Sequence, residues 1–236
     1  MTGWAPKRFW KAASVVPADG GFTVHLDGRP VKTPAKTPLI VPTPALAAAI
    51  AAEWDAQEGE VKPATMPMTR MANSALVKVP PAFEAVVDEV ARYGGTDLLC
   101  YRAEAPETLV QRQSREWDPL LDWAAQTFDA PLIVTAGVIP VDQPAESLQC
   151  LRAAVAAQDA FGLVGLHDLV AITGSLVLGL AVAQGRLTSD AAFTLSRLDE
   201  DWQAELWGID SEAAETAAAK RTDLSDAARF LALSAV

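Results

Sequence analysis

Histidine and cysteine side chains provide many of the nucleophiles, proton carriers and metal ligands of proteins, and this sequence has few of them. It contains two histidines, His25 and His167, and two cysteines, Cys100 and Cys150. The cysteines form no CxxC pair and have no histidine close by in the sequence, so neither a structural zinc site nor a disulfide framework is expected. The simplest expectation is a protein that keeps both thiols reduced.

Each histidine also has a structural explanation. His25 alternates with apolar residues along a predicted strand, which would place it on the solvent side of a sheet. His167 precedes Asp168 at the predicted start of an apolar helix, where the two side chains would serve as a cap. Neither histidine brings with it the further ligands that a metal site needs.

Sequence motifs with a known chemical role are also missing. The chain has no GxGxxG, Walker A, GxSxG, HExxH or EF-hand pattern, so no nucleotide, metal or other cofactor is expected. Its 30 Asp and Glu residues leave one enzymatic alternative open, a pair of carboxylates acting in a cleft between domains.

The formal charge of −11 is distributed unevenly along the chain. Residues 1–80 carry nine Lys and Arg against six Asp and Glu, whereas residues 81–236 carry ten against 24. The acidic part repels nucleic acids and anionic membrane surfaces, which leaves a basic or mixed protein surface as an acceptable partner. The same charge would also simply keep the protein soluble.

Membrane insertion is not expected either. The longest uncharged stretch, between Leu169 and Arg186, is interrupted by glycines and is too short for a comfortable span, so it predicts a buried central helix. The N-terminal segment lacks the apolar region of a secretory signal.

The elements expected to position these side chains begin with a small antiparallel meander over residues 9–34. Turns are predicted at 19–21 and 27–28, where Asp is followed by Gly. A helix over residues 44–57 follows Thr43, a predicted N-cap. A shorter helix is predicted over residues 67–77.

Two residues of these helices are candidate structural or partner-sensitive positions. Trp54 lies on the apolar stripe of the 44–57 helix and is expected to anchor the core. Arg70 is expected either on the surface or paired with a carboxylate at the domain junction. Pro80 and Pro81 then mark a break, so the sequence predicts an N-terminal β-rich α+β domain over residues 1–80 and a helical domain over residues 81–236.

Helical periodicity dominates the second domain, with predicted helices near 82–94, 106–128, 144–160, 166–185, 189–207 and 212–234. Pro119 is expected to kink or restart the second of these. Two short β-like runs, 98–102 and 131–141, are predicted to cross back to the sheet of the first domain. The predicted fold class is therefore α+β, mainly α, with a small antiparallel β-rich domain followed by an orthogonal bundle-like helical domain.

The segment from Thr188 to Gly208 combines an apolar stripe with a cluster of acidic residues. The stripe is expected to face a core; it consists of Ala191, Leu195, Leu198, Trp202 and Leu206. The acidic side chains are candidates for binding a partner; they are Asp199, Glu200, Asp201 and Glu205. Like charges at this spacing repel one another, so either water screens them or a basic surface meets them.

Eight segments, in this order, resemble one family. They are RFWK (8–11), LDGRPVKTP (26–34), AAEWDAQ (51–57), MPMTRMANSA (66–75), TDLLCYRAE (96–104), WDPLLDW (117–123), GSLVLGLAV (174–182) and SRLDEDWQAELWG (196–208). The family is that of the F1-ATPase assembly chaperones that handle the α subunit, sometimes called ATP-twelve. The resemblance runs nearly from end to end.

The resemblance implies a holdase without enzymatic activity that binds the free α subunit of F1-ATPase and releases it when the β subunit arrives. It implies no nucleotide of its own and a small β-rich domain followed by a helical one. Mitochondrial relatives carry a presequence that is not seen here, so the resemblance implies a bacterial member acting in the cytoplasm. The resemblance also implies that Trp54, Asp199 and Glu200 are sensitive positions.

Overall fold

The computed structural model describes residues 7–137 and 139–235. The chain divides into two compact units. Unit 1 comprises Met1–Phe83, Ala160–Gly165 and Arg229–Val236, and unit 2 comprises Glu84–Asp159 and Leu166–Ala228. The division falls within two helices, α6 (Ala160–Thr173) and α10 (Ser211–Ser234), so each unit contains a part of both. The domain boundary after residue 80 stays a prediction.

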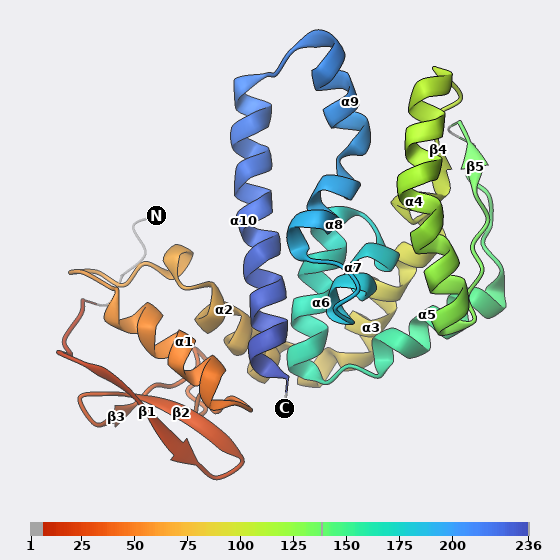
Figure 1. The fold of residues 1–236 in the computed structure, drawn as a ribbon. Helices are drawn as coiled ribbons and strands as arrows, with labels where there is room; N and C mark the ends of the chain where they lie inside the picture. The colour runs from red at the N-terminus through yellow and green to blue at the C-terminus, as the bar shows by residue number, and fades with distance from the viewer. Residues whose placement is uncertain (1–6, 138, 236) are drawn as a thin grey trace. The chain divides into compact units, whose positions relative to one another are not determined.

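Unit 1 contains the predicted meander, a three-stranded antiparallel sheet in the order β1-β2-β3 (Figure 1). The strands are β1 (Ala13–Ala18), β2 (Gly21–Leu26) and β3 (Arg29–Pro30). Val15 lies opposite Val24 in the register. Gly21 has a φ of +154° and sits so close to the Val41 carbonyl that a Cβ would lie 2.3 Å from its oxygen, so only glycine fits this turn.

Helix α1 (Pro44–Asp55) packs on this sheet (Figure 1). The predicted N-cap is confirmed, because the Thr43 hydroxyl accepts a hydrogen bond of 3.1 Å from the Leu46 amide. Leu46 and Ile50 are fully buried, as the apolar stripe predicts. The second predicted helix begins as α2 (Pro67–Asn73) and continues as a π-helical turn, η2 (Ser74–Lys78).

The ends of two distant helices complete the core of unit 1. Phe161 and Phe230 stack with ring centroids 6.0 Å apart. Gly165 allows close packing, since a Cβ there would lie 2.5 Å from Leu231 Cγ. The Thr43 hydroxyl also donates a hydrogen bond to the Leu233 carbonyl.

The remaining helices are α3 (Phe83–Ala91), α4 (Glu107–Phe128), α5 (Ala145–Ala156), α6 (Ala160–Thr173), α7 (Leu176–Ala183), α8 (Ser189–Ser196), α9 (Leu198–Trp207) and α10 (Ser211–Ser234). Short 3-10 turns complete the described chain: η1 (Pro63–Thr65), η3 (Pro80–Ala82), η4 (Arg92–Thr96) and η5 (Leu98–Cys100). Pro119 lies inside α4 without ending it. The core of unit 2 surrounds Trp117, whose side chain is 1% exposed. Among the helices of the described residues, none combines the length and apolar character that a bilayer crossing requires.

The helix predicted over residues 166–185 is in fact two helices, and this prediction was wrong. Gly174 ends α6 with a φ of +70°, and the Ser175 hydroxyl then caps α7 by accepting from the Leu178 amide at 3.0 Å. Because α6 begins at Ala160, His167 lies in its middle, so the predicted capping role is also wrong. The helix predicted over residues 189–207 is likewise divided, at Arg197 between α8 and α9.

The two β-like runs do not join the sheet of unit 1, which corrects a further prediction. They contain β4 (Tyr101–Arg102) and β5 (Thr135–Ala136), which pair with each other in parallel. An extended apolar pattern identifies a strand but not its partner. The predicted fold class is confirmed: a small antiparallel sheet is followed by a mainly helical chain.

Candidate functional site

The acidic cluster lies on α9, which packs beside α4 within unit 2. Asp199 and Asp201 are half-buried, whereas Glu200 and Glu205 are exposed. Each of the four carboxylates contacts a polar or basic side chain of the same chain. The sequence alone predicted repulsion among them and did not identify these partners.

Asp199 anchors α9 to α4 through a buried amide. The Gln113 side chain is fully buried, and its Nε2 donates to Asp199 Oδ1 at 2.7 Å. Its Oε1 accepts from the Ala103 amide at 2.9 Å. Because a buried amide left without partners is unfavourable, Asp199 has a structural role in fixing α9.

Glu205 makes a second contact between the same helices. The Arg112 Nη1 lies 2.8 Å from Glu205 Oε1 and 2.9 Å from Oε2. The guanidinium also lies 5.9 Å from the centroid of the Trp202 ring. Both charged side chains are partly exposed, so this ion pair contributes little to stability. It nevertheless links the C-terminal end of α9 to α4.

Glu200 and Asp201 have weaker partners. Arg197 lies 4.0 Å from Glu200 and 3.7 Å from Asp201, at the i,i+3 and i,i+4 positions of the chain. The Glu200 side chain is 56% exposed. Of the four acidic residues, Glu200 is therefore the one most available to an external partner. Arg197 could have been found from its spacing in the sequence, whereas Arg112 carries no such signal.

The apolar stripe predicted along residues 191–206 faces a core only in part. Leu198 is buried and Trp202 half-buried, but Leu206 is 57% exposed. All three side chains belong to α9, so the stripe is covered at the start of this helix and becomes exposed towards its C-terminal end. Trp207 and Ile209 follow and are even more exposed.

Trp54 and Arg70 belong to unit 1 and lie far from the acidic cluster of α9 in the sequence. The half-buried Trp54 ring meets Trp10 edge to face at 5.2 Å, and its buried Nε1 has no hydrogen-bond partner among the described residues. Arg70 is exposed on α2, and the described part of the chain gives it no ion pair. Trp54 thus packs against a neighbouring ring, whereas Arg70 lies on the surface, and the roles of both residues stay predictions.

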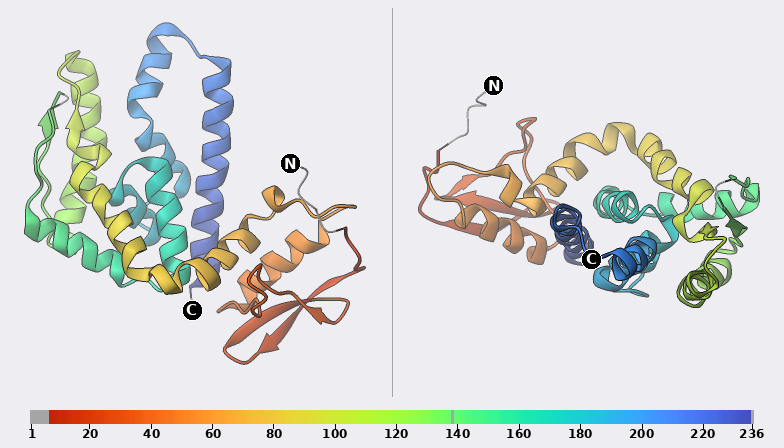
Figure 2. Two further views of the ribbon diagram at one scale, coloured as in Figure 1. Left: turned by 180° about the vertical axis from the view of Figure 1, so that it is seen from behind. Right: turned by 90° about the horizontal axis from the view of Figure 1, so that it is seen from above.

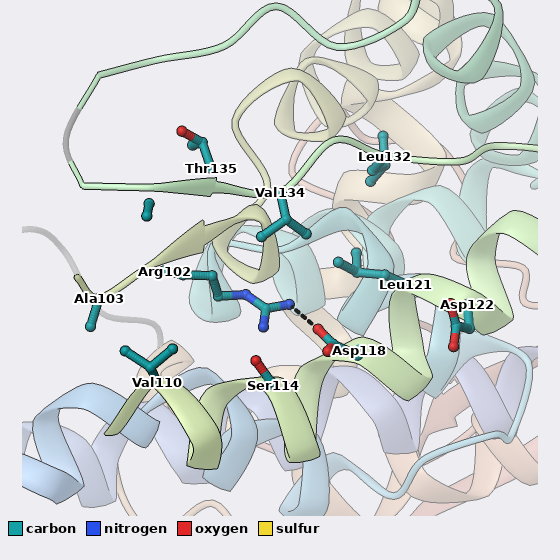
Figure 3. A pocket seen from close by; sticks show the side chains of 11 residues that line it. Arg102, Ala103, Val110, Ser114, Asp118, Leu121, Asp122, Leu132, Val134 and Thr135 are labelled. Carbon is teal, nitrogen blue, oxygen red and sulfur yellow. Dashed lines mark ion pairs between the residues drawn. The ribbon is translucent and has the colours of Figure 1, made fainter. Parts of the chain in front are cut away.

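A pocket of about 620 Å³ lies between α4 and the β4-β5 pair of unit 2 (Figure 3). Its wall is formed by Arg102, Ala103, Val110, Ser114, Asp118, Leu121, Asp122, Leu132, Val134, Thr135 and Ala136. Arg102 Nη2 lies 2.8 Å from Asp118 Oδ1, and Arg102 Nε donates to the Leu99 carbonyl at 2.9 Å. The guanidinium also lies 5.3 Å from the Trp117 ring centroid. These contacts give Arg102 a role in holding the wall of the pocket together.

Two of the chemically reactive side chains, Cys100 and His167, are engaged in packing or in a local pair. Burial, with the nearby charge of Asp97, raises the pKa of the Cys100 thiol to about 12, so it carries no thiolate at neutral pH. A hydrogen bond to Asp168, at 2.9 Å, raises the pKa of His167. Within residues 7–137 and 139–235, no three His, Cys, Asp or Glu side chains gather closely enough to hold a metal ion.

Comparison with known proteins gives consistent matches. The model of the ATP12 chaperone protein family matches residues 7–125. The crystal structure of Atp12 from Paracoccus denitrificans is 52% identical, with a TM-score of 0.94, and the match covers 97% of this chain and 98% of that one. A candidate chaperone from Agrobacterium tumefaciens is 43% identical, with a TM-score of 0.91, over 97% of this chain and 86% of that one. The mitochondrial atp12 protein of Schizosaccharomyces pombe is 27% identical over 228 residues, which are 89% of this chain and 76% of that protein.

Proposed function

Because the chain belongs to the ATP12 chaperone family, we propose that it binds the free α subunit of F1-ATPase during assembly of ATP synthase. It shields the exposed interface of that subunit from aggregation and hands it over when the β subunit arrives. The observation that carries this proposal is the match to the Atp12 structure from Paracoccus denitrificans along nearly the whole chain. An unassembled subunit exposes apolar surface, and a protein that covers it lowers the concentration of aggregating chains.

The proposed activity makes and breaks no covalent bond. The chain acts as a holdase without nucleotide, in the bacterial cytoplasm, and the competing β subunit brings about release. A binding role agrees with the state of two reactive groups, since the Cys100 thiol is buried and His167 is paired with the neighbouring Asp168.

We further propose that α9 faces the client. Charge complementarity sets the rate and orientation of association more than its final strength. Glu200 is the best placed of the four acidic residues, because its carboxylate is exposed and its contact with Arg197 is long. Asp199 and Glu205 act indirectly, by holding α9 against α4.

The test uses isolated F1 α subunit diluted from denaturant, with light scattering as the readout. Equimolar chaperone is expected to suppress scattering without ATP, and Glu200→Lys is expected to suppress it less while keeping the thermal unfolding of the wild type. Glu58→Lys is the matched control, because Glu58 is also exposed but lies in unit 1. Scattering that is equally fast with and without the wild-type chaperone contradicts the proposed function, and equal suppression by both variants contradicts the role of Glu200.

A further inference from the structure

Three large apolar side chains lie in water at the end of α9 and in the segment that follows it. Leu206 is 57% exposed, Trp207 78% and Ile209 80%. These three residues are called the apolar tip below. Tryptophan is a mostly buried residue type, and where it is exposed it is strongly enriched among the residues that dominate binding energy. The exposure of the apolar tip therefore indicates that it binds a partner.

Two side-chain contacts within unit 2 tie the helices on either side of the apolar tip to their neighbours. On one side, Arg112 Nη1 contacts both carboxylate oxygens of Glu205 and links the end of α9 to α4. On the other, Arg221 of α10 binds Asp190 of α8 at 2.7 Å through Nε and 2.6 Å through Nη2. Figure 2 shows α9 and α10 joined by a short segment, and the bounds of the two helices place Ile209 within it. A preorganised binding element loses less conformational entropy when it binds.

The first part of α10 forms without a core to support it. From Ser211 to Asp223 every residue is exposed except the half-buried Ala217. The helix is alanine-rich there, and its N-terminus is capped by Asp210 Oδ1, which accepts from the Glu212 and Ala213 amides at 2.8 and 3.0 Å. High helix propensity and a cap stabilise such a helix without tertiary packing. The surface beside the apolar tip thus stays uncovered.

The charge around the apolar tip selects the partner. Residues 198–219 contain seven Asp and Glu and no Lys or Arg. Glu212 and Glu215 are exposed next to the apolar tip, and neither makes an ion pair with the described residues. A complementary surface must therefore be apolar at its centre and basic at its border.

We propose that the apolar tip is the anchor by which this chaperone holds its client, and that it inserts into an apolar socket bordered by Lys and Arg side chains on the unassembled α subunit. This inference rests on the proposed function and adds to it the part of the chaperone that carries the affinity. The paired carboxylates of α9 hold the anchor in position, and the free carboxylates of α10 steer the basic border towards it.

The test measures the Kd of each variant for isolated F1 α subunit, together with suppression of its aggregation. Trp207→Ala is expected to raise the Kd by at least about tenfold, because truncation of an anchoring tryptophan removes a dominant contact. Ile139→Ala is the matched control, since Ile139 is 75% exposed and also lies in unit 2. Its Kd is expected to stay within about twofold of the wild type. Circular dichroism and thermal unfolding of both variants are expected to match the wild type.

The possible failures are distinguishable. A wild-type chaperone that neither binds nor protects the α subunit refutes the proposed function itself. A wild type that protects, with Trp207→Ala protecting equally well, overturns only the anchor. Equal losses in Trp207→Ala and Ile139→Ala also overturn it, because they would reflect general hydrophobicity.

Two further measurements test the identity of the partner surface. Replacing Glu212 and Glu215 by Lys is expected to slow association, and an unchanged association rate overturns the basic border. Light scattering after gel filtration reports the oligomeric state of the free chaperone. A dimer that Trp207→Ala converts to monomer overturns the client assignment in favour of a second copy of this chain.

Discussion

At the scale of single residues, Asp97 is the carboxylate most fully enclosed by its own fold. Its side chain is fully buried and accepts hydrogen bonds from the Ser175 hydroxyl at 2.7 Å, the Val177 amide at 2.9 Å and the Leu99 amide at 3.0 Å. It thereby joins the N-terminus of α7 to η5. Burial raises the pKa of Asp97 to about 6, although these hydrogen bonds favour the charged form and lower it.

The raised pKa of Asp97 predicts that its contribution to stability falls as the pH rises. The folded protein binds more protons than the unfolded chain between the ordinary value of 3.8 and about 6, so the stabilisation present at lower pH is lost as the pH passes through about 6. The Asp97→Asn variant has no ionisable group at this position, so it serves as the reference. From about pH 5 to about pH 7 the free energy of unfolding of the wild type is expected to fall relative to the variant by about 1 kcal/mol. Urea denaturation of both proteins across this pH range measures the difference. If the free energies of unfolding of the wild type and the variant change in parallel with pH, the raised pKa of Asp97 is contradicted.

Trp54 provides a second test at this scale, because packing and partner contact predict different outcomes. Trp54→Arg places a cation against the Trp10 ring and is expected to lower the free energy of unfolding by roughly 2 kcal/mol or more. Trp54→Phe keeps an aromatic contact and removes the buried indole N–H that lacks a partner, so a change below about 1 kcal/mol is expected. A Trp54→Arg variant with unchanged thermal unfolding and lost α-subunit binding would show a contact role instead.

At the scale of elements, local signals predicted some boundaries and missed others. Thr43 marks the start of α1, and the Asp-Gly turns mark the meander, because these residues act on the neighbouring backbone. The break between α6 and α7 was missed, because apolar residues continue across it from 166 to 185. Gly174 and Ser175 are an ordinary helix end followed by an ordinary cap, so this break could have been predicted. The break at Arg197 carries no comparable signal.

The break between α6 and α7 should depend on the missing side chain at Gly174. Its φ of +70° lies in the left-handed region, and a Cβ there would meet nothing within 4 Å, so backbone strain is the only penalty for a substitution. Gly174→Ala is expected to lower the free energy of unfolding by about 1–2 kcal/mol. Gly95→Ala is the control, because Gly95 has equally open space but a φ outside that region. Equal stabilities for the two variants in denaturant would contradict this account.

At the scale of the whole molecule, composition and pattern predicted the mainly helical α+β class and the acidic α9. They could not predict contacts between distant parts of the chain. Gln113 and Asp199 are 86 positions apart, and Arg112 and Glu205 are 93 apart. Because of these contacts, α9 is not an open acidic face. Two of its carboxylates attach the helix to α4. The exposure of Trp207 also depends on where α9 ends, which periodicity did not show.

The charge of the whole chain leads to a kinetic prediction that rests on the proposed function. With a net charge of −11, the chaperone is expected to attract a basic client surface over long distances, and salt screens such attraction as the Debye length falls from about 10 Å at 0.1 M to about 3 Å at 1 M. Dissociation depends on the packed apolar tip, which salt affects little. The association rate with the α subunit is therefore expected to fall steeply with salt while the dissociation rate stays nearly constant.

Stopped-flow fluorescence of the complex would separate the two rates. An uncharged osmolyte at matched osmolarity serves as the control, because it leaves the Debye length unchanged and should leave the association rate largely unaltered. The Glu212→Lys, Glu215→Lys variant should show a weaker salt dependence than the wild type, since it has lost charge beside the apolar tip. If salt instead changes only the dissociation rate, the acidic residues act within the bound interface, and long-range attraction by the net charge is not what brings the two proteins together.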